Sequence, residues 1–303
     1  MSTTIKSTGI EQVVLPAVRD LGDFQVRRAL PSAHRRMVGP FIFLDSFGPV
    51  TFGPGTGVDT RPHPHIGLAT LTYLLQGELV HRDSSHFVQT IAPGEVNLMT
   101  AGRGIVHSER SGGEIRAAGG PMFGFQAWLA LPVELEETVP TFQHVAADRL
   151  PHEEEAGVSL HLLAGALEGL RSPTRIFSET LYADVTLSPG ARFRVPGGHV
   201  ERAAYVVDGD ISVGGQDGRF EKDQLVVFKP DTEIVLATTQ GARLMILGGE
   251  PLREKRHIYW NFVSSRADRI EQACDDWAHG RFPNVPGETD FIPLPGMPSP
   301  TTA

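Results

Sequence analysis

The 303-residue sequence predicts an all-β protein built from two domains, with a short helix near its end. Three observations lead to this prediction. The chain is too long for one core of ordinary size, which favours two domains of about 130–150 residues. Short alternating segments recur from residue 11 to about residue 248. Finally, 33 glycines and 23 prolines provide the turns that many short strands need.

Strands are expected wherever apolar side chains alternate between turn residues. Pro93-Gly94 and Asp208-Gly209 are two of these turns. Strands of about five residues at this spacing indicate a sandwich or a barrel and argue against a βαβ fold. The segments are Leu71–Leu75, Val96–Met99, Gly124–Leu129, Tyr182–Leu187, Ala203–Val207, Leu225–Phe228 and Arg243–Leu247.

A weak internal repeat relates the two halves of the chain. Leu71–Glu78 (LTYLLQGE) resembles Ala203–Asp210 (AAYVVDGD), and Pro93–Val96 has a looser counterpart at Lys222–Leu225. A repeat at this separation indicates duplicated domains and not a solenoid.

The domain boundary is expected between Pro132 and Glu155, where acidic clusters replace strand signals. The N-terminal domain would then comprise residues 1–140, and the C-terminal domain residues 141–303. Ser264 or Ser265 is expected to cap a helix that continues to about His279. Its buried face would carry Ile270, Cys274 and Trp277, and the Pro-rich tail from Phe282 onward would wrap the surface or fray.

Composition argues against several classes of protein. The net charge of −9, without a run of Lys or Arg, gives no sign of nucleic-acid binding. One cysteine, Cys274, cannot form an internal disulfide, which fits a reducing cytosol. We find neither the apolar core of a secretory signal nor a run of about 20 apolar residues that could span a membrane. A soluble cytoplasmic protein is expected.

Two short motifs carry ligands for a metal ion. They are His63-Pro-His65 and His107-Ser-Glu109. Residues two apart in a strand project from one face, so each pair can reach a common point. If the two strands face each other across a barrel, all four ligands converge. Three imidazoles and one carboxylate would leave two octahedral positions for water, substrate or dioxygen.

The ligand types narrow the choice of metal. No thiolate is available near the motifs, because Cys274 lies in the expected helix, and this argues against a structural zinc site. Mixed imidazole and carboxylate ligation suits Fe(II), our first choice, and tolerates Mn, Co, Ni, Cu or Zn. Histidines are common in cores and on surfaces, so spacing alone leaves open whether the two motifs share a site.

At these residues the sequence resembles the pirin family of the cupin superfamily. The resemblance is strong over His63–Leu68, Thr70–Glu78, His81–Ser84 and Ala92–Glu109, and looser at Leu247–Leu252 and after Ile270. It implies two cupin (jelly-roll) β-barrels packed face to face. It also implies one metal ion in the N-terminal barrel, held by the residues at the family's ligand positions: His63, His65, His107 and Glu109.

The resemblance suggests two kinds of function. Several pirins have been assigned quercetin 2,3-dioxygenase activity, which implies a flavonol-like aromatic substrate and dioxygen, with Glu109 as either the general base or a plain fourth ligand. A eukaryotic pirin is regarded as an iron-dependent transcriptional co-regulator. The alternatives are therefore a metal-binding regulatory protein that contacts a protein partner, for which the acidic clusters would serve, or another cupin reaction such as isomerisation. Resemblance to the pirin family therefore predicts the metal site more firmly than it predicts the reaction.

The sequence departs from the family pattern in one loop. His86-Phe87 stand where a glycine is usual, in a shortened loop near the family's barrel mouth, which implies a different substrate preference. The second domain lacks a ligand set, because Val195 and Gly197 align with His63 and His65. His199 is therefore interpreted as an ordinary histidine, although it forms an HxE pair with Glu201.

Several neighbours of the motifs have two interpretations. His81 and Asp83 either orient a ligand imidazole or lie exposed in a loop. Arg103, between two glycines, would pair with an acidic group or bind substrate. Gln126 is expected to point toward the metal, and Phe125 and Trp128 to point the other way.

Overall fold

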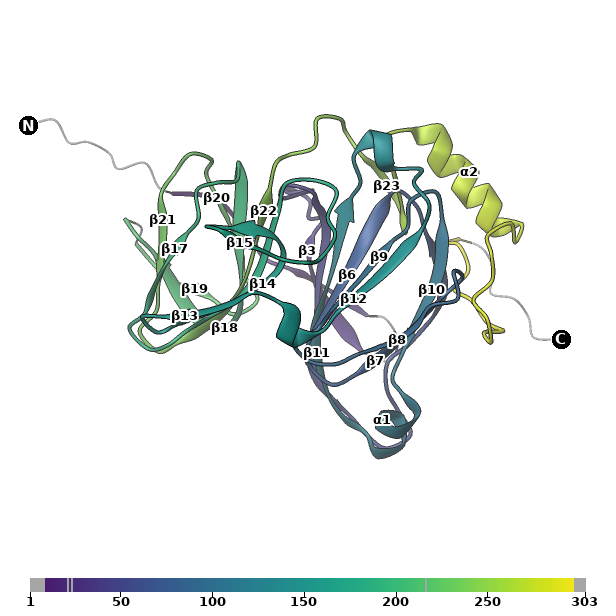
Figure 1. Cartoon of the computed structure of the whole chain (residues 1–303), viewed down its shortest axis with the longest axis horizontal. Coiled ribbons are helices and arrows are strands. Elements are labelled where there is room, and N and C mark those ends of the chain that lie inside the picture. Colours follow the sequence, from purple (N-terminus) through teal and green to yellow (C-terminus); the bar gives the residue numbers. More distant parts are fainter. Residues whose placement is uncertain (1–8, 21, 23, 216, 297–303) are drawn as a thin grey trace, which may run out of the picture. The chain divides into compact units, whose positions relative to one another are not determined.

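The computed structural model describes residues 9–20, 22, 24–215 and 217–296 (Figure 1). Within this part of the chain the fold consists mostly of short β-strands. Two compact units are present. One contains described residues of the ranges 1–18, 27–43 and 148–251, and includes the C-terminal barrel. The other contains those of 19–26, 44–147 and 252–303, and includes most of the N-terminal barrel; each barrel is defined below by its sheets.

The N-terminal barrel is built on two sheets. In the first, the strand order is β12-β9-β6-β11-β4-β3-β2, and in the second it is β5-β10-β7-β8. Apolar side chains from both sheets, including Phe47, Leu74 and Leu79, form one core cluster between them. The first sheet comprises β2 (Ala17–Asp20), β3 (Gln25–Leu30), β4 (Phe41–Phe52), β6 (Leu68–Gln76), β9 (Val96–Thr100), β11 (Gly120–Ala130) and β12 (Thr141–Val145). The second comprises β5 (Asp59–His65), β7 (Leu79–Asp83), β8 (Val88–Ile91) and β10 (Ile105–Arg110).

The C-terminal barrel is built on one eleven-stranded sheet whose main path is β1-β20-β18-β22-β16-β14-β13. Its interior is filled by a large apolar cluster to which Val195, Ala204 and Val226 contribute. The strands are β1 (Ile10–Val14), β13 (His152–Glu155), β14 (Val158–Leu167), β15 (Leu170–Arg171), β16 (Thr180–Leu187), β17 (Arg192–Val195), β18 (Glu201–Val213), β19 (Phe220–Glu221), β20 (Leu225–Phe228), β21 (Ile234–Ala237) and β22 (Ala242–Gly249).

Strand register explains the internal repeat. In β6, Tyr73 stands opposite Val96 on β9 and Phe125 on β11. In β18, Tyr205 stands opposite Leu225 on β20 and Met245 on β22. The repeated segments are thus equivalent strands of two barrels, each between equivalent neighbours. All seven segments predicted as strands lie within strands of the structure.

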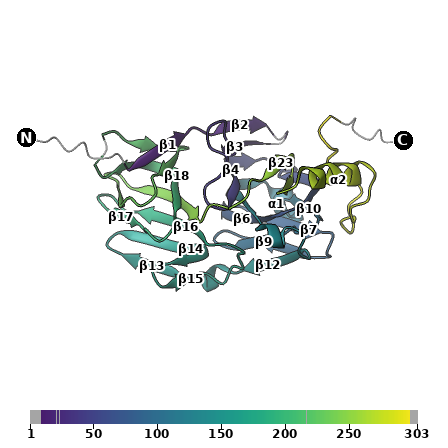
Figure 2. The same cartoon turned by 90° about the horizontal axis from the view of Figure 1, so that it is seen from above.

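The compact units differ from the linear division at residue 140. Strand β1 pairs with β20, so the first described residues belong with the C-terminal barrel. Residues 252–296 belong with the N-terminal barrel, because Ile66 forms a β-bridge with Phe262 and helix α2 (Ala267–Ala278) contacts β23 (His257–Tyr259) and β24 (Phe262–Ser264). Both views place α2 beside the strands of this barrel (Figures 1 and 2). The late segment extends the barrel that carries the two metal-ligand motifs.

Helix α2 begins later than predicted. Its N-cap is Arg266, which makes no side-chain cap hydrogen bond, and Ser264 Oγ instead accepts the Arg266 N–H at 3.1 Å. The predicted face is correct, because Ile270 is buried and Cys274 and Trp277 pack against the same cluster.

The described part of the Pro-rich tail follows the barrel surface. Trp277 Nε1 donates to the carbonyl of Ile292, whose own N–H donates to the carbonyl of Pro62 on β5. On β10, Ser108 and Arg110 point outward and bind Glu288, at 2.8 Å from the serine hydroxyl. Residues 297–303 lie outside the described residues. The tail therefore wraps the barrel through residue 296.

The acidic segment is only partly solvated. Three short helices, η1 (Val133–Leu135), η2 (Ala147–Arg149) and α1 (Gly113–Ala118), interrupt the strands. Just after η1, Glu136 is buried, pairs with Arg256 at 2.8 Å and accepts the Ser265 N–H. Glu136 therefore cannot belong to the acidic clusters considered for a protein partner, whereas Glu153–Glu155 on β13 are exposed. No helix among the described residues is long and apolar enough to cross a membrane.

Candidate metal centre

The two ligand motifs lie on neighbouring strands of one sheet. Antiparallel β5 and β10 pair with His63 opposite His107 and His65 opposite Ile105. Our expectation that the strands face each other across the barrel is therefore wrong. Residues opposite each other on antiparallel strands project from the same face. The side chains of the two motifs are therefore neighbours on one face of one sheet. A bulge between His107 and Glu109 shifts the register at the second motif.

The imidazoles of His63, His65 and His107 converge. Their ligand nitrogens lie within 4.8 Å of one another, and Nε2 of His65 is 3.1 Å from Nε2 of His107. Two nitrogens bound to one ion at about 2.1 Å, with an angle near 90° between them, lie about 3.0 Å apart. The spacing of these two nitrogens therefore fits adjacent positions on a single ion.

A backbone carbonyl sets the tautomer of His63. Its Nδ1 lies 2.8 Å from the carbonyl oxygen of Arg61. Because a carbonyl only accepts, Nδ1 must carry the proton, which leaves the Nε2 lone pair available for a metal.

A chain of side chains sets the tautomer of His107. His81 Nε2 lies 2.9 Å from Oδ2 of Asp83, and His81 Nδ1 lies 3.3 Å from Nδ1 of His107. With neutral His81 donating to Asp83, its Nδ1 accepts from Nδ1–H of His107, and Nε2 of His107 keeps its lone pair. Of the two roles considered for His81 and Asp83, the structure has the orienting one, since both side chains are buried.

The loop after β7 holds Asp83 in place. Oδ1 of Asp83 accepts the N–H groups of Ser85 and Phe87 at 2.8 and 3.2 Å. His86 adopts a left-handed φ of 71°, a conformation in which glycine is more usual. Phe87 stacks on Phe142, which stacks on His81 with ring centroids 4.5 Å apart. The His86-Phe87 departure from the family pattern thus supports the ring that orients His107.

Glu109 lies beside the imidazoles in a polar network. It forms a second group of converging ligand atoms with His81 and His107, again within 4.8 Å. Its Oε1 lies 3.1 Å from the Thr72 hydroxyl, and its Oε2 lies 3.4 Å from Nε2 of Gln126. The Thr72 hydroxyl also lies 2.6 Å from Oε1 of Gln126, so its single hydrogen serves one of these two acceptors at a time. Gln126 therefore points toward the site, as predicted.

Trp128 corrects the prediction made for strand β11. Its ring meets the His65 ring edge-on, with centroids 5.1 Å apart. Trp128 and Gln126 are two residues apart in one strand and share a face, so placing them on opposite faces was wrong. Phe125, one residue away from Gln126, instead packs near Phe123.

Burial determines the protonation of the imidazoles. It lowers the pKa of His63 from 6.5 to about 4, and it holds the pKa values of His65 and His107 well below their ordinary value. All three rings are therefore neutral at pH 7, the form that binds metals. Burial also raises the pKa of Glu109, and hydrogen bonds from Thr72 and Gln126 oppose this shift. A bound cation would favour its carboxylate form.

The C-terminal barrel has no corresponding cluster among its described residues. Val195, at the position of His63, is buried in the apolar core. His199 lies 3.3 Å from the carbonyl of Ala166, and Glu201 binds Arg35 and the Gly39 N–H. His199 is thus an ordinary histidine, as predicted.

Three residues of the site were not predicted. Thr72 and Trp128 could have been found from strand alternation, because Thr72 is a polar residue in the apolar strand β6 and Trp128 shares the face of Gln126. Phe142 gave no signal, since it lies in the segment with few strand features.

Two barrels, one with converging imidazoles between its sheets and one filled by apolar side chains, define a bicupin protein. A pirin sequence profile matches residues 23–129, and a profile of the pirin C-terminal cupin domain matches residues 182–283. The chain belongs to the pirin family.

Relatives match the chain along nearly all of its length. A pirin-like protein of Caulobacter vibrioides is 47% identical over 91% of this chain and 96% of its own. A Pseudomonas aeruginosa protein with a provisional quercetin 2,3-dioxygenase name is 38% identical over 96% of this chain and 90% of its own. The crystal structure of quercetin 2,3-dioxygenase from Acinetobacter baumannii has a TM-score of 0.87 and 33% identity, covering 96% of this chain and 97% of that one.

Proposed function

We propose that the protein is a metal-dependent dioxygenase that cleaves a flavonol such as quercetin at a mononuclear site in the N-terminal barrel. His63, His65, His107 and Glu109 would hold one divalent ion, with Fe(II) as the resident metal. The observation that carries the proposal is the convergence of three neutral imidazoles with a carboxylate alongside. The quercetin 2,3-dioxygenase names among the relatives supply the reaction class.

The donor set fits this assignment. Imidazole and carboxylate ligands suit Fe(II), and Cys274, the one cysteine, lies on α2 and is absent from the cluster. The tautomers of His63 and His107 both direct Nε2 lone pairs to the site. When bound, the ion would supply Lewis-acid stabilisation of an ionised substrate hydroxyl and a place to bring substrate and dioxygen together.

Glu109 is the proposed general base. Its burial raises its pKa, which strengthens it as a proton acceptor, and the flavonol 3-hydroxyl proton would move to one of its carboxylate oxygens. Thr72 and Gln126 hold the carboxyl group from the opposite sheet and so limit its rotation. The Trp128 ring packs edge-on against His65 and so limits the rotation of that imidazole.

The test is turnover of quercetin, measured as oxygen uptake together with carbon monoxide release. Protein loaded separately with Fe, Mn, Co, Ni or Cu would be compared with the His107→Ala variant. His199→Ala, a histidine change in the other barrel, is the matched control. Metal-dependent turnover that is lost in His107→Ala and kept in His199→Ala supports the proposal.

Full metal occupancy without turnover of any flavonol would overturn the dioxygenase proposal. The metal site would then belong to a binding or regulatory protein. Turnover that persists in metal-free protein would contradict the proposed site.

A further inference from the structure

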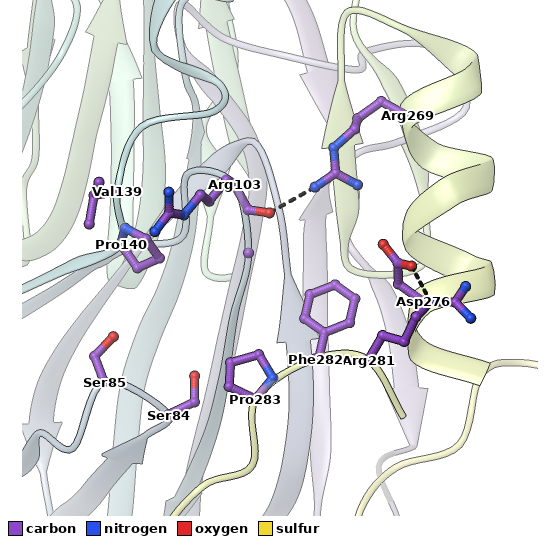
Figure 3. A pocket seen from close by; sticks show the side chains of 11 residues that line it. Ser84, Ser85, Arg103, Val139, Pro140, Arg269, Asp276, Arg281, Phe282 and Pro283 are labelled. Carbon is purple, nitrogen blue, oxygen red and sulfur yellow. Dashed lines mark hydrogen bonds and ion pairs between the residues drawn. The ribbon is translucent and has the colours of Figure 1, made fainter. Parts of the chain in front are cut away.

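A cavity lies in the N-terminal barrel, outside the metal cluster. It has a volume of about 410 Å³, and its lining comes from the β7–β8 loop, the turn before β10, the segment before β12, and α2 with the residues after it (Figure 3). None of the four proposed metal ligands lines it. Its polar side chains are not used by the proposed reaction.

Arg103 is presented to this cavity by a fixed backbone. Its N–H donates to the carbonyl of Thr138 at 2.9 Å, and its carbonyl accepts from Nη2 of Arg269 at 2.7 Å. The tight turn requires glycine at Gly102, where φ is +50° and a Cβ would lie 2.0 Å from the Thr138 oxygen. The exposed Arg103 guanidinium forms no ion pair among the described residues. The backbone of Arg103 is therefore fixed, and the charge of its side chain remains available to a ligand.

Arg269 brings a second guanidinium from α2. Its Nε donates to Glu137 at 2.9 Å and its Nη2 to Arg103, but Nη1 is buried without a hydrogen-bond partner in the described part of the chain. Because Nη1 has almost no accessible surface, Arg269 contributes the positive charge of its guanidinium beside the cavity and not an open donor. Figure 3 shows this guanidinium pointing from α2 toward the cavity.

Two hydroxyl groups lie on another side of the cavity. Ser84 Oγ accepts the Val106 N–H at 3.1 Å, so its own hydrogen is still available to donate. Ser85 is exposed at the rim. Both hydroxyls point toward the space shared with Arg103 (Figure 3). Guanidinium and hydroxyl donors around one space are suited to a carboxylate.

The surrounding charges limit the charge of the ligand. Three guanidinium groups, of Arg103, Arg269 and Arg281, line the cavity together with the carboxylate of Asp276. Glu137 pairs with Arg269, and exposed Asp275 shares Arg281 with Asp276. The carboxylates offset most of the guanidinium charge around the cavity. The remaining positive charge is too small to neutralise a dianion such as phosphate, but it suffices for a monoanion.

The remaining lining is apolar and flat. Pro140 and Val139 stand on one side in Figure 3, and Phe282 and Pro283 on the other. Such walls favour a planar hydrocarbon body. We propose that this cavity binds a small aromatic carboxylate, with its carboxylate held by Arg103 and the serine hydroxyls beside the charge of Arg269, and its ring between the proline and phenylalanine walls. The inference does not depend on the proposed dioxygenase activity.

Benzoate is the probe, titrated calorimetrically into the full chain in metal-loaded and metal-free forms. Benzamide serves as the neutral ligand of similar shape, and inorganic phosphate as an anion without a ring. We expect one benzoate per chain in both metal states, with benzamide and phosphate at least about tenfold weaker. Arg103→Gln should weaken benzoate by about tenfold to a hundredfold, as expected for one charged hydrogen-bonding group. Arg253→Gln, at an exposed arginine of the same barrel, is the matched control.

Ser85→Trp provides an independent variant, because it fills the rim without changing any charge. It should abolish benzoate binding and leave the circular dichroism spectrum unchanged. Benzoate affinity that is unchanged in Arg103→Gln, or binding that requires the metal, would place benzoate elsewhere and overturn the proposal. So would phosphate binding as tightly as benzoate, or the absence of saturable benzoate binding.

Discussion

Nδ1 of His107 lies 3.3 Å from Nδ1 of His81, and the far nitrogen of His81 ends on the Asp83 carboxylate. Through this contact, the tautomer of the His81 ring decides the tautomer of the His107 ring. The carboxylate accepts a hydrogen bond from Nε2–H of His81, Nδ1 of His81 accepts one from Nδ1–H of His107, and His107 is left with its lone pair on Nε2. A buried carboxylate that contacts no proposed ligand directly thus determines which His107 nitrogen can bind a metal.

Asp83→Asn should therefore weaken metal binding. The amide would present a donor to His81, reverse both tautomers and place a proton on Nε2 of His107. The amide oxygen can still accept from Ser85 and Phe87, so the loop should remain folded. We expect a loss of about 10- to 100-fold in metal affinity, measured by competition with a chelator. Exposed Asp148→Asn is the control, and an unchanged affinity in Asp83→Asn would mean that the tautomer of His107 is set otherwise.

Removal of a proposed ligand should have a larger effect than removal of an orienting group. His63→Ala and His107→Ala should each lose stoichiometric metal, because one ligand of four is missing. His199→Ala should retain it, since His199 contacts only a backbone carbonyl in the other barrel. The metal content of each of the three variants is measured after gel filtration. Full occupancy in His63→Ala or His107→Ala would refute the ligand set.

The metal-free protein should lose stability as the pH falls from 6.5 toward 4. Burial lowers the pKa of His63 to about 4, so the unfolded chain takes up a proton near pH 6.5 that the folded chain refuses. The free energy of unfolding should fall by about 1.4 kcal/mol per pH unit for each such histidine. Urea titrations across this range give the slope. His63→Gln should reduce this slope by about 1.4 kcal/mol per pH unit, the contribution of one histidine. The same slope in His63→Gln and in the unchanged protein would contradict neutral burial of His63.

Breaking the buried ion pair between Glu136 and Arg256 should destabilise the N-terminal barrel. Both side chains are almost inaccessible, and Glu136 also binds Ser264 and Ser265 ahead of α2. Glu136→Ala leaves a buried guanidinium without its carboxylate, for which we expect a loss of about 3–5 kcal/mol in the free energy of unfolding. Exposed Glu154→Ala should change it by less than about 0.5 kcal/mol. Similar values for the two variants would show that the pair contributes little.

Local patterns in the sequence predicted seven strands of the described chain and the positions of the site motifs. Alternation and turns located the strands, and the Tyr73 and Tyr205 repeat identified two barrels, because these features depend on residues close in the chain. Spacing alone could also place His63 beside His65 and His107 beside Glu109, since residues two apart share a face of a strand. The alternation rule extends to Trp128, although the prediction misapplied it.

Pairing between distant segments required the tertiary structure. That β5 and β10 are neighbours in one sheet, that β1 joins the C-terminal barrel and that α2 joins the N-terminal one all depend on contacts between residues far apart in the chain. The same holds for the Asp83–His81–His107 chain, the burial of Glu136 and the cavity around Arg103 and Arg269. The sequence determined which side chains could hold a metal. Only the tertiary structure decided which partners orient them, because hydrogen bonds and burial depend on distance in space and not on separation along the chain.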